Sequence, residues 1–317
     1  MYASDKNLRK IIPVISGKGG VGKSLIAANT GAALAMAGLD VTMVDLDLGG
    51  SNLHTYLGVR NKSRGVGNAL ATGDRAIADL AVETGISGLR LVPGDTMTSG
   101  VANPGAAEKK RITAAIEGME ADFIIADLGA GAADTVLDLA VMSNSPVLVV
   151  APTIPSVLNA YALLKNIVAR EFLRLSARHK AVHVWLKEQF AEEEPGSLPP
   201  IAEITAGIEE ADADLADLCR GFLRDYRPNL VLSMAHTPES AALAERLRDL
   251  CRRNLDLQVG CLGAVSFDPL VQRTERFERP LVAEEDGTLA AAQIRRIAEK
   301  LRQSPRFPRL ALALDLY

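Results

Sequence analysis

Short apolar segments alternate along the chain with longer stretches in which apolar residues recur at helical spacing. The short segments are apolar almost throughout, as expected of strands that are buried on both faces of a parallel sheet. They cover residues 11–16, 41–45, 89–92, 123–127, 147–151, 230–233 and 259–265. Helical spacing covers residues 23–37, 106–119, 135–142, 155–175, 238–254 and 289–303. The pattern predicts a doubly wound α/β fold, with a mostly parallel sheet and helices on both faces.

The stretch from residue 171 to 228 interrupts this alternation. It is rich in charge and proline and has helical patterning without a clear strand. We therefore expect a single domain over residues 1–303 that carries a helical insertion or lid at 171–228. His179 and His183 lie four residues apart in it, a spacing found in metal sites, but no third ligand accompanies them in a fixed register. We expect a surface helix there.

The C-terminal region allows several interpretations. Residues 289–303 place an apolar stripe opposite a basic face, which fits a final helix packed on the sheet and also a helix at a membrane surface. Residues 304–317 form an apolar tail in which leucines alternate with other residues. An edge strand, a partner-docking tail and a membrane anchor all remain open for this tail.

Composition narrows the possible functions. The chain has 317 residues, of which 48% are hydrophobic and 23% charged, enough to bury a large core. A net charge of -4 and an aromatic content of 4% argue against a nucleic-acid partner. The three cysteines form no CxxC pair, which argues against a disulfide framework and a cysteine cluster site. Without a signal peptide or a membrane-length apolar run, we expect a cytoplasmic protein with at most peripheral contact at the inner face of the cell membrane.

The strongest chemical signal is a glycine-rich loop between the first predicted strand and helix. It matches GxxxxGK[ST] in full, and its residues are Gly17, Lys18, Gly19, Gly20, Val21, Gly22, Lys23 and Ser24. Glycines allow consecutive backbone N–H groups to converge on phosphate oxygens at a helix N-terminus. In such a loop the lysine corresponding to Lys23 reaches the β- and γ-phosphates, and the hydroxyl of Ser24 ligates Mg²⁺. The motif predicts a nucleotide triphosphate site.

Three aspartates follow two of the predicted strands. Asp45 and Asp47 stand at the end of the second strand, and Asp127 ends the strand at 123–127. Because the carboxyl ends of parallel strands share one edge of the sheet, these carboxylates are expected near the phosphate loop. A buried acid in the position of Asp127 is typical of a Walker B motif that holds Mg²⁺ or its water. The alternative for Asp45 or Asp47 is that it caps a helix begun near Ser51.

The run from Lys18 to Ser24 resembles the deviant Walker A signature KGGxGK[ST] of the MinD/ParA family. This resemblance implies ATP and Mg²⁺ as ligands and a homodimer in the ATP-bound state, in which Lys18 reaches the phosphates of the partner. It further implies that Asp47 orients the attacking water, that Asp45 supports the Mg²⁺ shell, and that the switch segment at Gly129 senses the γ-phosphate through its backbone.

Later segments refine the resemblance, which covers most of residues 10–303. Residues 127–131, 152–156 and 159–161 are similar to the branch of flagellar-number regulators, FlhG and FleN. Two positions depart from the family pattern. Leu128 stands where many relatives have Thr, Ser or Cys, and Ser233 stands at the strand end where an Asn commonly reads adenine. Ser lacks the paired amide pattern, so base selectivity is less secure than phosphate binding.

These features predict a slow Mg²⁺-dependent ATPase that dimerises with ATP and responds to an activating protein partner. By resemblance, it positions or counts a cellular structure of the flagellum type. The alternative is a ParA-like DNA segregation ATPase that binds nonspecific DNA. An iron–sulfur carrier is disfavoured by the missing CxxC pair, a tyrosine kinase by the isolated Tyr317, and an inactive scaffold by the intact set of lysines and aspartates.

Overall fold

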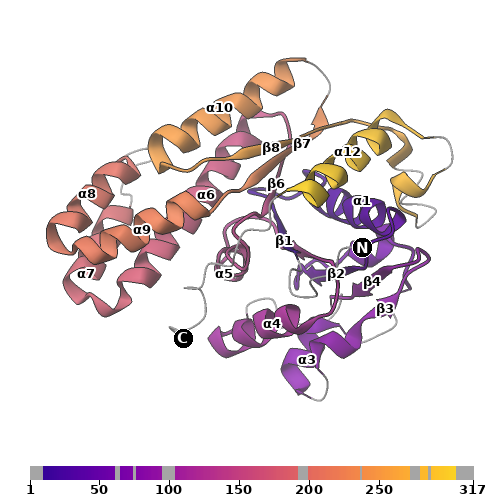
Figure 1. Cartoon of the computed structure of the whole chain (residues 1–317), viewed down its shortest axis with the longest axis horizontal. Coiled ribbons are helices and arrows are strands. Elements are labelled where there is room, and N and C mark those ends of the chain that lie inside the picture. Colours follow the sequence, from indigo (N-terminus) through magenta and orange to yellow (C-terminus); the bar gives the residue numbers. More distant parts are fainter. Residues whose placement is uncertain are drawn as a thin grey trace, which may run out of the picture.

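A computed structural model describes residues 10–60, 65–73, 76–94, 104–191, 199–235, 238–271, 279–284 and 287–304. A twisted sheet of eight strands crosses the molecule, with helices on its two faces (Figure 1). The strand order is β3-β4-β2-β5-β1-β6-β7-β8, and every pairing is parallel except that of β3 with β4. The predicted fold class is confirmed.

The strands are β1 (Lys10–Ile15), β2 (Val41–Leu46), β3 (Val82–Glu83), β4 (Leu89–Val92), β5 (Phe123–Leu128), β6 (Val147–Val150), β7 (Asn229–Ala235) and β8 (Gly260–Ser266). Their apolar residues alternate between two hydrophobic clusters. In β5, for example, Ile124 and Ala126 face one cluster, while Phe123 and Ile125 face the other. This alternation places one core on each side of the sheet, because successive side chains of a strand point to opposite faces.

The helices are α1 (Lys23–Met36), α2 (Leu53–Tyr56), α3 (Val66–Thr72), α4 (Ala106–Gly118), α5 (Asp134–Ala140), α6 (Ile154–Leu175), α7 (Lys180–Phe190), α8 (Ile201–Ala211), α9 (Ala213–Asp225), α10 (Pro238–Leu255) and α12 (Leu289–Gln303). Three short 3₁₀ turns, η1 (Ile77–Leu80), η2 (Ser176–Arg178) and η3 (Leu281–Ala283), lie between them. Buried residues of α1 and α12 share one cluster, and those of α4, α5, α6 and α10 share the other. The two cores are therefore covered by separate sets of helices.

The predicted helical region contains α7, α8 and α9, which gather at one end of the molecule beside the second half of α6 (Figure 1). Their buried side chains belong to the same cluster as those of α6, and Phe222 stacks on Tyr226 at 5.1 Å between ring centroids. The expected boundary at residue 171 falls inside α6, which continues to Leu175. A role for this region as a lid over the nucleotide stays a prediction.

Several features differ from or extend the sequence prediction. Strand β3 and the short helices α2 and α3 carry too few periodic residues to be recognised, and β7 continues two residues beyond Ser233. Lys10 donates from Nζ to the carbonyl oxygen of Leu301 at 2.8 Å, so the last described helix is tied to β1. The predicted tail lies outside the described residues beyond Ser304. Among the described helices, none is long and apolar enough to cross a membrane.

Candidate functional site

The glycine-rich loop joins β1 to α1 and leaves the N-terminus of that helix open. Gly20 and Gly22 have φ angles of 76° and 83°, in the left-handed region that other residues rarely adopt. Gly22 is the N-cap residue of α1, and no side chain caps the first turn. The free N–H groups and the positive end of the helix dipole therefore face the loop, as a phosphate site requires.

Two contacts fix the start of this loop. A Cβ atom at Gly17 would lie 2.2 Å from the carbonyl oxygen of Asn159 in α6, so the two backbones touch and only glycine fits. The N–H of Gly131, after β5, donates to the carbonyl oxygen of Ser16 at 2.9 Å. The loop is thus held by α6 on one side and by the switch segment after β5 on the other.

Lys23 and Asp127 form a buried ion pair at the base of the loop. Lys23 Nζ lies 2.7 Å from Asp127 Oδ1 and 3.5 Å from Ser24 Oγ. The other carboxylate oxygen, Asp127 Oδ2, is buried without a hydrogen-bond partner in the described part of the chain. Burial raises the pKa of Asp127, against the opposing effect of Lys23. An orphaned carboxylate oxygen beside a serine hydroxyl fits a cation that both would ligate.

Asp45 is the neighbour of Asp127 in the sheet, because the two residues are paired in the β2–β5 register. Its carboxylate accepts hydrogen bonds from Ser51 Oγ at 2.6 Å and from the N–H of Leu53 at 3.1 Å. Burial and the nearby Asp127 raise its pKa to about 7. Leu53 begins α2, so Asp45 also stabilises a helix N-terminus, in agreement with the capping alternative. The bonds from Ser51 and Leu53 both go to Oδ2, and Oδ1 accepts from the N–H of Asp47 at 3.2 Å, so both oxygens are already engaged.

The carboxylates and hydroxyl around the phosphate loop suit Mg²⁺, which shares its ligands with phosphate and water, better than a metal ion bound by protein side chains alone. The described residues contain no group of three or more His, Cys, Asp or Glu side chains that could hold a metal ion. Mg²⁺ is ordinarily bound by one or two carboxylates together with substrate phosphates and water. Asp127 and Ser24 are the residues that would ligate such an ion directly, while Asp45, whose oxygens already accept hydrogen bonds, would support its surroundings.

Asp47 lies beside the switch segment. Its Oδ1 is 3.7 Å from the position that a Cβ would take at Gly129 and 3.4 Å from the corresponding position at Gly50. The residue is half-buried, so its carboxylate is not sealed from water. The structure thus brings Asp47 and Gly129 together at the carboxyl ends of β2 and β5.

Lys18 differs from Lys23 in its surroundings. Its side chain is exposed, and no hydrogen bond or ion pair of that side chain is found within the described residues. Its carbonyl oxygen accepts from Ser16 Oγ at 3.1 Å, which holds the loop backbone. Gly19 and Gly20 are also exposed, whereas Val21 packs into the core. Within the part of the chain that the structure describes, Lys18 is therefore an exposed lysine without a side-chain partner.

Ser233 is buried near the end of β7. Its Oγ lies 2.9 Å from the position that a Cβ would take at Gly22, so the hydroxyl faces the phosphate loop. The following residue, Met234, has a φ of 54°, which turns the strand end. A contact of Ser233 with adenine stays a prediction, and the contact observed is with the loop backbone.

Some participants are not evident from sequence motifs. Ser51 and Asn159 touch site residues through tertiary contacts, and neither belongs to the loop motif. The serine has a local signal, since it closely follows the two aspartates and precedes a helix. In the helical region, His179 Nδ1 lies 2.5 Å from Asp212, and His183 Nδ1 lies 3.0 Å from Ser176 Oγ, so both rings have structural partners.

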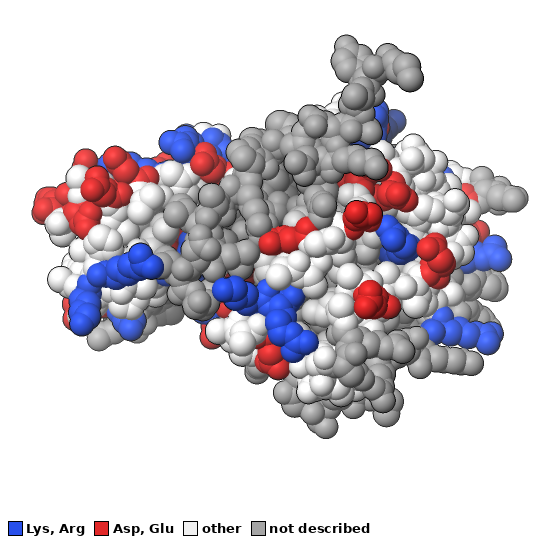
Figure 2. Space-filling model, turned by 60° about the horizontal axis from the view of Figure 1, so that its bottom comes forward, with Lys and Arg blue, Asp and Glu red and all other residues white. Residues whose placement is uncertain are grey.

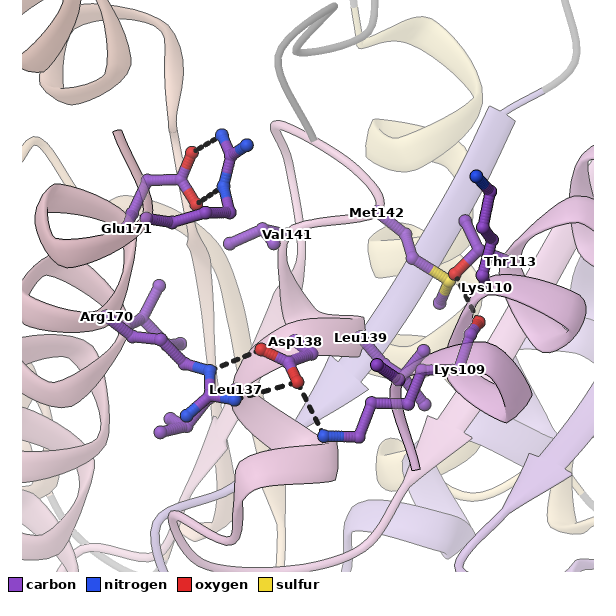
Figure 3. Close-up of a pocket in the computed structure, with 13 residues that line it drawn as sticks. Lys109, Lys110, Thr113, Leu137, Asp138, Leu139, Val141, Met142, Arg170 and Glu171 are labelled. Atoms are coloured by element: carbon purple, nitrogen blue, oxygen red, sulfur yellow. Dashed lines mark hydrogen bonds and ion pairs between the residues drawn. The ribbon is translucent and has the colours of Figure 1, made fainter. Parts of the chain in front are cut away.

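A separate cleft lies between α4, α5 and α6 (Figure 3). At its centre, Asp138 accepts from Lys109 Nζ at 2.7 Å and from Arg170 Nη2 at 2.9 Å, while Leu137 and Met142 contribute apolar lining. Its lining includes no residue of the phosphate loop and none of the three aspartates discussed above. The ion pairs join three helices on one face of the sheet, and we assign them a structural role.

Known proteins resemble about half of the chain in sequence. The Helicobacter pylori flagellum site-determining protein YlxH is 32% identical over 166 residues, which are 52% of this chain and 55% of that protein. An iron-sulfur cluster carrier protein of Saccharolobus solfataricus is 32% identical over 169 residues, 51% and 54% of the two chains. The antiactivator FleN of Pseudomonas aeruginosa is 30% identical over 158 residues, 49% and 55%. The chain spans about half the length of these relatives.

The similarity in fold extends over most of the chain, whereas the family model matches about half of it. The septum site-determining protein MinD from Pyrococcus horikoshii, complexed with Mg-ADP, aligns with a TM-score of 0.64 at 20% identity, covering 93% of this chain and 97% of that one. This likeness concerns the fold alone. The model of a family described as ParA, NUBPL iron-transfer P-loop NTPase, matches residues 7–170, just over half of the 317 residues. The chain therefore belongs to the ParA/MinD family of P-loop NTPases.

Proposed function

We propose that this chain is a Mg²⁺-dependent ATPase that dimerises when it binds ATP and acts as a switch in positioning or counting a cellular structure. Two features of the same loop carry the proposal: a buried Lys23–Asp127 ion pair at the open end of α1, and an exposed Lys18 whose side chain has no partner among the described residues. The first fits phosphate binding within one chain. The second fits a contact made outside it.

Each residue has a distinct task in this proposal. The N–H groups of residues 19–24 and the Lys23 ammonium bind the phosphates, and the contact of Gly17 with α6 keeps the loop in place. Mg²⁺, held by Ser24 and Asp127 and supported by Asp45, would neutralise phosphate charge when bound. Asp47 orients the water that attacks the γ-phosphate, and the backbone at Gly129 responds to the presence of that phosphate. Catalysis therefore rests on positioning and electrostatics.

The proposed reaction is slow until another molecule completes the site. Asp47 is half-buried and remains near solvent, so water around it is incompletely ordered in one chain. A second copy and an activating protein would close the site and raise the rate. Such a slow hydrolysis suits a timer, because the ATP-bound dimer persists until a partner triggers its release.

The cellular role proposed is control of the site or number of a flagellum-type structure. Support comes from the similarity to a flagellum site-determining protein and to the antiactivator FleN. We place the protein in the cytoplasm, with peripheral contact at the inner face of the membrane through residues 304–317. Deleting residues 305–317 should then reduce sedimentation with anionic liposomes while the unfolding transition of the domain is retained. Equal sedimentation of both proteins would remove the membrane contact.

Two other functions are less well supported. DNA segregation would call for a basic surface, and the face in Figure 2 carries Lys, Arg, Asp and Glu side chains in mixture. An iron–sulfur carrier would need cysteines that converge, whereas Cys219 and Cys251 are buried and Cys261 is exposed. A salt-dependent affinity for duplex DNA in the ATP-bound state would favour segregation over the positioning role.

The experiment that tests the proposal separates assembly from hydrolysis. Light scattering after gel filtration with ATP and Mg²⁺ would be combined with phosphate release. Lys18→Ala should bind ATP, stay monomeric and lose turnover. Asp47→Ala should form the dimer and hydrolyse at least about 10²-fold more slowly, as when a positioned acid or base is removed. If wild type and both variants stay monomeric with saturating ATP, the dimerising switch is wrong for this chain.

A further inference from the structure

Two large apolar side chains stand exposed one turn apart on α6. Ile154 is 64% exposed and Leu158 is 55% exposed. Among the exposed large apolar residues of the described chain, these two alone share an element. Isolated apolar residues at a surface are common, whereas residues spaced i and i+4 form one ridge of a helix and can be covered together. This ridge is a candidate contact surface.

The ridge is fixed in position next to the phosphate loop. Thr153 caps α6 by accepting from the N–H of Ser156 at 3.3 Å, and Ser156 Oγ accepts from the N–H of Ala151 at 3.0 Å. Leu158 immediately precedes Asn159, whose carbonyl oxygen meets Gly17. Lys18 immediately follows Gly17. The exposed lysine and the exposed leucine are therefore each one residue away from the same backbone contact.

We propose that Ile154 and Leu158 form the apolar part of the contact between two copies of this chain in the ATP-bound state. The inference rests on the proposed function, and it names the surface that the dimer buries. A molecule that covers Lys18 and the bound phosphates also approaches the first turns of α6, because the loop and the helix touch at Gly17 and Asn159. The contact would be made by this ridge on each copy.

A second copy fits this surface for two reasons. A two-fold dimer places the same patch on both partners, and a ridge with i, i+4 spacing can pack beside its own copy. Lys18 is an exposed cation, and a second copy with bound ATP brings phosphate charge toward it. The surface therefore combines an apolar ridge with a cation whose complement is the nucleotide of the other copy.

The test compares glutamate substitutions at equally exposed positions. Leu158→Glu and Ile154→Glu place a charge in the proposed contact, and a glutamate near the N-terminus of α6 is compatible with the helix dipole. Val184→Glu on α7, where the side chain is 56% exposed, is the matched control. Dimerisation would be measured by sedimentation velocity with Mg²⁺ and the non-hydrolysable analogue AMP-PNP. We expect the dimer dissociation constant to rise at least about tenfold for both α6 variants and to stay unchanged for the control.

Nucleotide binding by the monomer serves as the second measurement. At protein concentrations well below the dimer dissociation constant, all variants should bind AMP-PNP as wild type does, since neither side chain belongs to the phosphate site. A circular dichroism melt would confirm that each variant is folded. Leu158→Ala, which adds no charge, should weaken the dimer in the same direction by a smaller factor.

Cross-linking tests whether the two ridges lie close to each other in the dimer. Leu158→Cys would be placed in a Cys261→Ser background, because Cys261 is the exposed cysteine and the other two are buried. A bismaleimide should then link two chains with AMP-PNP and fail to do so without nucleotide.

Three outcomes would overturn the inference. If Leu158→Glu dimerises as wild type does, this ridge is not the contact, while the proposed switch still stands. If that variant keeps the dimer but loses stimulation by an activating protein, the ridge belongs to a different partner. If wild type binds AMP-PNP and stays monomeric, both the inference and the proposed function fail.

Discussion

Gly17 meets Asn159 so closely that a Cβ atom on the glycine would lie 2.2 Å from the asparagine carbonyl oxygen. Because the obstacle is helix backbone, a side chain at position 17 cannot be accommodated by a rotamer change. The first glycine of the loop motif therefore serves the packing of the loop on α6, whereas Gly20 and Gly22, with positive φ angles, serve the loop conformation.

This contact predicts unequal effects for two glycines of one loop. Gly17→Ala should lower the free energy of unfolding by about 2–3 kcal/mol, as overpacking does, and should weaken ATP binding by displacing the loop. Gly19→Ala has no atom within 4 Å of its new methyl group, so its stability should stay within about 0.5 kcal/mol of wild type. Urea unfolding without nucleotide would measure both. Equal stability of the two variants would contradict the packing role.

The Lys23–Asp127 pair predicts a strong coupling between two substitutions. Lys23→Met leaves a fully buried carboxylate without its cation and should cost about 3–5 kcal/mol of stability at pH 8. Adding Asp127→Asn removes the stranded charge and should restore most of that loss. The measurement is urea unfolding of wild type, both single variants and the double variant. Additive losses in the double variant would show that the pair is not coupled.

More of the fold than of the candidate site could be predicted from the sequence. Each of the seven predicted strands is present, because a buried parallel strand carries its own apolar signal. Strand β3 has two residues and pairs antiparallel at the sheet edge, so it has no such signal. In the site, the loop motif could be predicted because its residues are consecutive in the sequence. The meeting of Gly17 with Asn159 and the orientation of Ser233 arise from tertiary packing, which no spacing encodes.

The orientation of Ser233 leads to a prediction about the base. Its hydroxyl faces Gly22, so Ser233→Ala should change the affinities for ATP and GTP by the same factor. Isothermal titration with both nucleotides would measure this ratio, and ATP should bind in each protein. A loss confined to ATP would show that the hydroxyl reads adenine. A clear preference of wild type for GTP would overturn the assignment of ATP.

Asp45 predicts a pH dependence of stability in the nucleotide-free protein. Burial and the neighbouring Asp127 raise its pKa from 3.8 to about 7. Between these values the folded chain holds a proton that the unfolded chain has released, so stability is greatest at low pH and falls as pH rises through this window. The slope from one such group is at most about 1.4 kcal/mol per pH unit.

Asp45→Asn lacks this proton and isolates the contribution of Asp45 from those of the other acids. The unfolding free energy of wild type minus that of Asp45→Asn should therefore decrease from pH 5 toward pH 7 and level off near pH 8. Urea titrations without nucleotide or Mg²⁺ would measure the difference at each pH, and effects common to both proteins cancel in it. A difference that stays constant, or grows with pH, would mean that Asp45 is ionised throughout this range and that its hydrogen bonds outweigh burial and the charge of Asp127 in setting its pKa.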